Sequence, residues 1–131
     1  MTMGATTQGV VIAHGPMASA MVDAVRRITG GHADALTAVS NDGLSPEELC
    51  RELEDLLGEH PGVIFTDLAA GSCGLAAMST CRDRELRAVL AGVNLPMLLE
   101  FVFHRDLPLD ELVQRVEEKG RASIVQPAPR A

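Results

Sequence analysis

The stretch GVVIAHGP, residues 9–16, decides how the N-terminal part of the chain folds. Its first five residues form a short continuous apolar run with β-branched side chains, which predicts a strand buried on both faces. Apolar residues then recur at spacings of three and four, as on the buried face of an amphipathic helix: Met17, Ala20, Met21, Ala24, Val25 and Ile28. The pair Gly30-Gly31 follows as a stop signal. This segment therefore predicts a buried strand, a turn and a helix that packs on the sheet.

The alternation of strand and helix continues along the chain. Short apolar segments at 35–39, 63–66 and 87–91 predict three more strands, and 122–126 is a candidate for a last short one. Ser45, Pro46 and Glu48 have the spacing of a helix start with a capping box. The leucines that follow predict the buried face of that helix, with Gly58 as its end: Leu49, Leu53, Leu56 and Leu57.

The C-terminal half of the chain predicts three further helices. A short helix is expected from the glycine-containing loop at 70–72 to Met78, and Asn94 is a plausible cap for another. A last helix is expected at 108–119, with Gly120 as its C-terminal cap. Its buried face is expected to carry four apolar residues: Leu109, Leu112, Val113 and Val116.

This order of elements predicts an α/β fold with a doubly wound, mainly parallel sheet. Open sheets of this kind hold their sites at the carboxyl ends of the strands, near a topological switch point. His14 ends the first predicted strand and Asp67 ends the third. These two residues are therefore the first candidates for a functional site.

The residue types at this edge suit phosphoryl or proton transfer. A carboxylate such as Asp67 that bonds one ring nitrogen of His14 fixes the tautomer and leaves the other nitrogen free to attack. Gly71 and Ser72 stand where a helix N-terminus would present backbone N–H groups to an anion. Structural readings stay open, because His14 also suits a packed or loop histidine and Asp67 a turn or capping residue.

The remaining histidines and the cysteines give weaker signals. His32, His60 and His104 have no such partners in the sequence and are expected to be solvated. Cys73 follows the possible anion loop, where it is either reactive or, more simply, a small buried residue. The chain has three cysteines, Cys50 and Cys81 being the others, without the paired spacing of a disulfide framework or a zinc motif.

Composition excludes several classes of protein. The 131 residues predict one domain. A formal net charge of −7 argues against a nucleic-acid binder, and three phenylalanines without Trp or Tyr leave few platforms for stacking ligands. No apolar run reaches the length of a membrane-spanning helix, and the first eight residues do not resemble a signal peptide. We therefore expect a cytoplasmic protein, and free cysteines agree with a reducing compartment.

Three short motifs resemble one protein family. Residues 14–18, HGPMA, after a strand and before a helix, resemble the active-site turn of the mannose-family enzyme IIA domains of the bacterial sugar phosphotransferase system. Residues 66–72, TDLAAGS, resemble the second motif of that family, an Asp followed by a Gly-Ser turn. Residues 91–98, AGVNLPML, resemble the third. The resemblance keeps order and spacing from residue 9 to about 125.

The resemblance implies a function for this edge of the sheet. The phosphocarrier protein HPr would phosphorylate His14, which would pass the phosphoryl group to a histidine of a separate enzyme IIB, making the chain a phosphotransferase in sugar uptake. Asp67 would bond the other ring nitrogen, and Leu68, Gly71 and Ser72 would bind the phosphoryl group. No metal or organic cofactor is implied.

The family also implies a fold and an assembly. It implies a flavodoxin-like domain, here residues 9–126 between flexible tails at 1–8 and 127–131, with a four-stranded parallel core. A further antiparallel strand, matched in position by 122–126, would be exchanged across a homodimer. The chain departs from the family where Cys73 replaces the usual Pro and Ala70 the usual Gly. The departures leave the partner and the sugar open.

Two other functions remain compatible with the same residues. The chain could be a regulatory phosphoacceptor that reports phosphotransferase flux without feeding a transporter, since this needs the same His14. It could also be a non-catalytic module that binds a small anion. A receiver domain is disfavoured, because Ala13 and His14 offer no acidic pair for magnesium.

Overall fold

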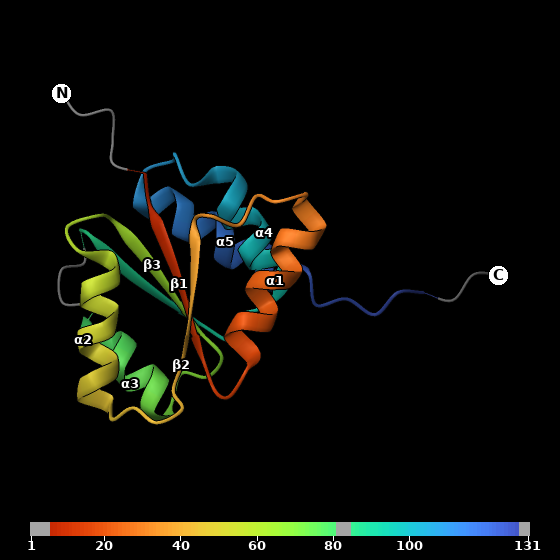
Figure 1. The fold of residues 1–131 in the computed structure, drawn as a ribbon. Coiled ribbons are helices and arrows are strands. Elements are labelled where there is room, and N and C mark those ends of the chain that lie inside the picture. The colour runs from red at the N-terminus through yellow and green to blue at the C-terminus, as the bar shows by residue number, and fades with distance from the viewer. Residues whose placement is uncertain (1–5, 81–84, 129–131) are drawn as a thin grey trace.

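The structure, a computed structural model, describes residues 6–80 and 85–128. Within these ranges the chain forms a four-stranded parallel sheet in the order β2-β1-β3-β4, together with five helices (Figure 1). The elements follow one another as β1 (Gln8–Ala13), α1 (Met17–Thr29), β2 (Leu36–Ser40), α2 (Pro46–Leu57), β3 (Gly62–Thr66), α3 (Gly71–Thr80), β4 (Arg87–Ala91), α4 (Leu95–His104) and α5 (Leu109–Ala122). The α/β class and the mainly parallel sheet predicted from the sequence are confirmed, and β1 begins one residue earlier than expected.

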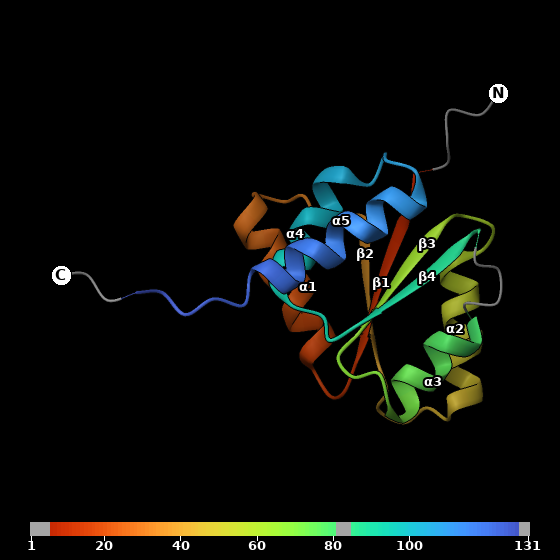
Figure 2. The same cartoon turned by 180° about the vertical axis from the view of Figure 1, so that it is seen from behind.

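Helices cover both faces of the sheet. Figures 1 and 2 show α2 and α3 on one face and α1, α4 and α5 on the other. Side chains of β1 alternate between the two layers: Val11 packs with α1 and α4, and Val10 and Ile12 pack with α2 and α3. This burial on both faces explains why the strands are continuous apolar runs in the sequence.

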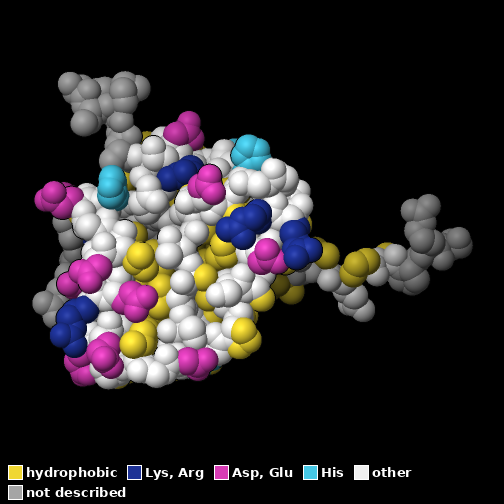
Figure 3. Space-filling view, in the orientation of Figure 1, with side chains coloured by type: hydrophobic (Ala, Val, Ile, Leu, Met, Phe, Trp, Pro, Cys, Tyr) yellow, Lys and Arg dark blue, Asp and Glu magenta, His cyan; other side chains and the backbone are white. Residues whose placement is uncertain are grey.

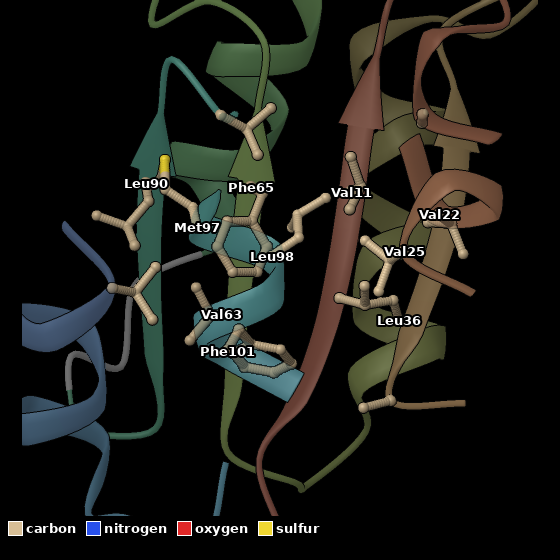
Figure 4. Close-up of a cluster of buried hydrophobic side chains, with 14 of the residues drawn as sticks. Val11, Val22, Val25, Leu36, Val63, Phe65, Leu90, Met97, Leu98 and Phe101 are labelled. Carbon is tan, nitrogen blue, oxygen red and sulfur yellow. The ribbon is translucent and has the colours of Figure 1, made fainter. Parts of the chain in front are cut away.

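The larger apolar cluster lies under α1, α4 and α5 (Figure 4). At its centre the rings of Phe65 and Phe101 meet edge to face, with centroids 5.4 Å apart. Gly9 lets α4 approach β1 closely, since a Cβ at this position would stand 2.7 Å from the Phe101 ring. Phe101 is fully buried, and burying a side chain of this size contributes about 1.5–3 kcal/mol to the stability of this layer.

The predicted helix starts of α2 and α4 are confirmed. Ser45 Oγ accepts a hydrogen bond from the backbone N–H of Glu48, whose carboxylate accepts one from the Ser45 N–H, and Pro46 is the first helical residue. Asn94 caps α4 by accepting from the Met97 N–H at 3.1 Å. Gly58 ends α2 as expected. Several acidic side chains gather on the surface over α2, beside a basic one (Figure 3).

The expected buried face of α1 was wrong in part: Val25 is buried and Met21 packs against the core as expected, but the face is turned toward Ala18 and Val22. Ala18, Val22 and Val25 are its buried residues, whereas Met17 and Ile28 are 40% and 58% exposed. The sequence contains a second helical stripe of Met and Ala beside the true one. Ala18, Val22 and Val25 fill the space above the sheet as part of its core cluster. In α2, Leu56, which was expected on the buried face, is 39% exposed.

The C-terminal helix also differs from its predicted end. Helix α5 continues past Gly120 to Ala122, so Gly120 is no cap. It is buried, and a Cβ there would stand 2.5 Å from Met97 Cγ, so the glycine permits close contact of α5 with α4. Residues 124–128 have no regular secondary structure and extend away from the body of the molecule (Figures 1 and 2). The strand expected at 122–126 is therefore not formed in the single chain, where α5 runs to Ala122 and the residues after it point away from the sheet (Figures 1 and 2).

Candidate active site

The topology brings the ends of β1 and β3 together. These strands are parallel neighbours, with Ile12 opposite Thr66 in the register. In the sheet β2 lies on one side of β1 and β3 lies on the other, so the chain changes direction across the sheet between these strands. The carboxyl ends of β1 and β3 are therefore the topological switch point. His14 and Asp67 follow directly, so the fold places both predicted site residues at this point.

Asp67 holds His14 by two hydrogen bonds to one oxygen. Its Oδ2 lies 2.7 Å from His14 Nδ1 and accepts the backbone N–H of His14 at 3.0 Å. The Oδ1 atom accepts the Leu68 N–H at 2.9 Å. Burial raises the pKa of Asp67, but the hydrogen bonds and charge interaction with His14 and the bond from Leu68 outweigh it, so the pKa is lowered. The ionised carboxylate therefore favours the Nδ1–H tautomer and leaves Nε2 with its lone pair.

A residue that the sequence analysis missed, Asn41, fixes the turn that carries His14. Its side-chain Oδ1 accepts the Gly15 N–H at 3.3 Å, and its own N–H donates to the Ala13 carbonyl at 3.2 Å. Gly15 has a φ of +59°, which favours glycine in this turn. Asn41 follows β2 at the same edge, but asparagine is so common in turns that the sequence alone did not distinguish it.

The N-terminus of α3 faces the free side of the His14 ring. Gly71 is the first residue of this helix, and a Cβ added to it would lie 3.9 Å from His14 Nε2 and Cε1. Its φ of +86° belongs to the left-handed region, whereas Ala70 has an ordinary negative φ, so alanine causes no strain there. Unpaired N–H groups and the helix dipole favour an anion at such a position.

The other residues of the β3–α3 segment are placed as follows. Ser72 is half-buried in the first turn of α3, and the Leu68 side chain is 58% exposed. Thr66 Oγ1 donates to the Leu68 carbonyl at 2.9 Å and shapes the loop. The Cys73 side chain is buried in the apolar cluster beneath α2 and α3, in agreement with the structural interpretation of this residue.

The remaining histidines lie apart from this edge. His32 and His60 are exposed, as expected, and the His32 ring lies against Phe103. His104 differs from its expectation, because it is half-buried in the last turn of α4 and its Nε2 lies 3.3 Å from Glu100. Cys81 lies outside the described residues. In the part of the chain that the structure describes, no helix has the length and apolarity needed to cross a membrane.

Sequence comparisons connect this architecture with sugar phosphotransferase systems. Residues 9–117 match the EIIA-man family, described as the PTS system fructose IIA component. The sorbose-specific EIIA component of Klebsiella pneumoniae is 30% identical over 112 residues, which cover 82% of each chain. The mannose-specific EIIAB component of Escherichia coli K12 is 42% identical over 66 residues, or 48% of this chain, and this match spans only 20% of that longer relative.

Solved structures show the same fold. The phosphotransferase component EIIA from Streptococcus agalactiae superposes with a TM-score of 0.84 at 23% identity, covering 92% of this chain and 96% of that one. The mannose/sorbose-specific IIA subunit from Enterococcus faecalis gives a TM-score of 0.83 at 24% identity, covering 96% and 98%. The flavodoxin-like arrangement is thus confirmed, and with the match over residues 9–117 it follows that this chain belongs to the EIIA-man family of phosphotransferase-system IIA components.

Proposed function

We propose that the chain is a cytoplasmic phosphohistidine carrier that accepts a phosphoryl group from phospho-HPr on His14 and passes it to an enzyme IIB during sugar uptake. The observation that carries the proposal is the bond of His14 Nδ1 to Asp67, which leaves Nε2 free beside the N-terminus of α3. Membership of the EIIA-man family supports the same role.

The transfer uses the ring in its neutral form. The Nε2 lone pair of His14 attacks phosphorus, and the bond from phosphorus to the donor nitrogen breaks with its electrons returning to the donor. The Nδ1 proton stays on the ring, which becomes cationic and is stabilised by the Asp67 carboxylate. Phosphoryl transfer of this kind depends mainly on alignment and charge stabilisation.

The N-terminus of α3 supplies the second half of the site. We assign the phosphoryl oxygens to the backbone N–H groups at Gly71 and Ser72, where helix geometry leaves donors without internal partners. Leu68 remains a predicted phosphoryl-binding residue, although its N–H donates to Asp67 Oδ1. Its exposed side chain lies beside the site and offers apolar surface to a partner protein.

The proposal is tested by phosphorylation with labelled phosphoenolpyruvate, enzyme I and HPr. The wild type is expected to take up one acid-labile, alkali-stable label, and His14→Ala to take up none. His60→Ala, which removes an exposed histidine elsewhere, is the matched control and is expected to be labelled normally. An unlabelled wild type, or equal labelling of His14→Ala, would contradict the proposal. Release of the label to an added enzyme IIB separates a carrier from a purely regulatory phosphoacceptor.

We also propose a homodimer in which residues 122–126 of each copy pair with β4 of the other. Within the described residues β4 pairs only with β3, so its outer edge is open. A groove of about 450 Å³ runs along this edge, with Leu90, Met97 and Ile124 among its lining residues. Ile124 and Val125 are 81% and 68% exposed in the single chain, although both are apolar. A monomer in sedimentation would contradict this arrangement.

A further inference from the structure

We propose that His14, Asp67 and Cys73 together bind a thiophilic divalent cation such as Zn²⁺, and that this ion prevents His14 from accepting a phosphoryl group. The binding of the ion stands on the geometry alone, whereas its effect on phosphorylation rests on the function proposed above. The ion would be a blocking ligand and not a cofactor of the transfer.

The three side chains converge on one point. A ring nitrogen of His14, a carboxylate oxygen of Asp67 and Cys73 Sγ all lie within 4.8 Å of one another. Zn²⁺ binds nitrogen, oxygen and sulfur ligands at about 2.0–2.3 Å, so a tetrahedral ion needs these atoms about 3.3–3.6 Å apart. The 2.7 Å separation of Nδ1 and Oδ2 must widen by about 0.6–0.9 Å, through rotation of the half-exposed His14 ring, and a separation near the 4.8 Å limit must shorten by about 1 Å.

The backbone bonds of the site can survive this change. An ion that takes the place of the Nδ1 proton beside Asp67 Oδ2 leaves that oxygen its bond from the His14 backbone N–H and leaves Oδ1 its bond from the Leu68 N–H. Cys73 lies in the first turn of α3 and is held in place by its apolar surroundings. Cys73 and Asp67 would therefore be the two fixed ligands of the ion, and His14 would be the ligand that moves.

The charges of the three ligands match a divalent cation. A neutral imidazole, a carboxylate and a thiolate carry two negative charges, so an ion of charge +2 makes the site neutral. Binding releases the thiol proton to solvent, as metal binding to cysteine requires. Burial is the main cause that raises the pKa of the Cys73 thiol, and the negative charge of Asp67 raises it further. A bound cation removes both penalties, because it neutralises the charge of Asp67 and bonds the sulfur directly.

The ligand set selects the kind of ion. Thiolate and imidazole favour Zn²⁺ and similar ions over Mg²⁺ and Ca²⁺, which prefer oxygen ligands. The His14 side chain is 45% exposed, so an ion can enter from solvent on that side and keep a water as its fourth ligand. The family usually has proline at the position of Cys73, and proline has no side chain that binds a metal. The complete set of three ligands therefore depends on the cysteine of this chain.

Metal binding and phosphorylation compete for the lone pairs of the ring. An ion on Nδ1 leaves the neutral imidazole with its proton on Nε2, which then has no lone pair to attack phosphorus. An ion on Nε2 occupies the acceptor atom itself. In either case His14 cannot accept the phosphoryl group while the ion is bound.

The site is tested by titrating the reduced full chain with Co²⁺ and recording the thiolate-to-cobalt charge-transfer band in the near ultraviolet. The wild type is expected to show the band at one equivalent, and added Zn²⁺ to remove it by displacement. A Cys50→Ser/Cys81→Ser variant, in which Cys73 is the only cysteine, is expected to keep the band. Cys73→Ser is expected to lose it while its circular dichroism stays native.

A second experiment measures the effect on phosphorylation. Stoichiometric Zn²⁺ is expected to reduce the labelling of the Cys50→Ser/Cys81→Ser variant by phospho-HPr at least tenfold. When Cys73 is also replaced by serine, Zn²⁺ is expected to leave the labelling unchanged.

The outcomes of the two experiments are distinguishable. A wild type without the cobalt band, or a band that persists in Cys73→Ser, overturns the metal site. A band together with labelling that Zn²⁺ does not change overturns the competition. A band in a chain that HPr does not label even without metal overturns the proposed function and supports the metal site.

Discussion

One carboxylate oxygen of Asp67 holds both the ring and the backbone of His14, through Nδ1 at 2.7 Å and the main-chain N–H at 3.0 Å. The His14 ring is thereby tied to the neighbouring strand end, and the His14 backbone with it. This double attachment fixes the position of the ring and the identity of its free nitrogen together.

Replacing Asp67 by asparagine is expected to slow phosphoryl transfer by about 10²–10⁴-fold, because the amide supplies no negative charge to the ring that becomes cationic. The measurement is the initial rate of labelling by phospho-HPr. Asp42→Asn, which neutralises an exposed carboxylate after β2, is the matched control and is expected to react at the wild-type rate. Equal rates for Asp67→Asn and the wild type would show that the charge of Asp67 does not assist the transfer.

Replacing Asn41 by alanine is expected to loosen the turn that carries His14. The change removes the acceptor of the Gly15 N–H, a bond worth about 1 kcal/mol, and we expect transfer to slow about tenfold in protein that remains folded. Asn41→Asp keeps an oxygen at this position and is expected to restore most of the rate. If both variants lose stability but transfer normally, Asn41 has no role in positioning His14.

Replacing Gly71 by alanine is expected to affect both stability and transfer. Its φ of +86° costs about 1 kcal/mol for a residue with a Cβ, and the new methyl group would stand 3.9 Å from Nε2, the atom to which the proposed function assigns the phosphoryl group. Gly30→Ala is the matched control, since Gly30 has a φ of +72° with nothing near its Cβ position. Urea unfolding is expected to show a loss in both variants, and the labelling rate a loss only in Gly71→Ala.

Replacing Gly120 by alanine is expected to destabilise the chain by about 1–3 kcal/mol, because the new methyl group would overlap Met97 between α5 and α4. Urea unfolding of this variant, of Met97→Ala and of the double variant forms a mutant cycle. The second substitution is expected to relieve the overlap, so the losses should be less than additive. Additive losses would mean that the two side chains do not meet.

Much of the fold could be predicted because local signals agreed with the tertiary structure. The apolar run before His14, the capping box at Ser45 and the cap at Asn94 each depend on a few adjacent residues, and the structure confirms them. The phase of α1 could not be predicted in the same way. It depends on which of two adjacent stripes fills the space above the sheet, and that space is formed by β1, β2 and α4.

In the candidate site, too, some features follow from a simple rule on the sequence and others depend on tertiary contacts. His14 and Asp67 could be placed together from the rule that parallel strands end at one edge, and the structure brings them into contact. Asn41 acts through a hydrogen bond to a turn 26 residues away, which leaves no local pattern in the sequence. The sequence predicts Gly120 as a helix cap, because nothing in it shows that Met97 lies against this glycine.

The open edge of β4 also bears on how the chain avoids aggregation. An edge strand with unpaired backbone groups can recruit any extended segment, and the exposed Ile124 and Val125 are such a segment on every copy. Glu117 and Arg121, an ion pair at 3.0 Å, stand among the residues that line the groove beside this edge. Charged side chains at this place would disfavour indiscriminate strand addition, and in the proposed homodimer they would leave the edge to the partner's C-terminal segment.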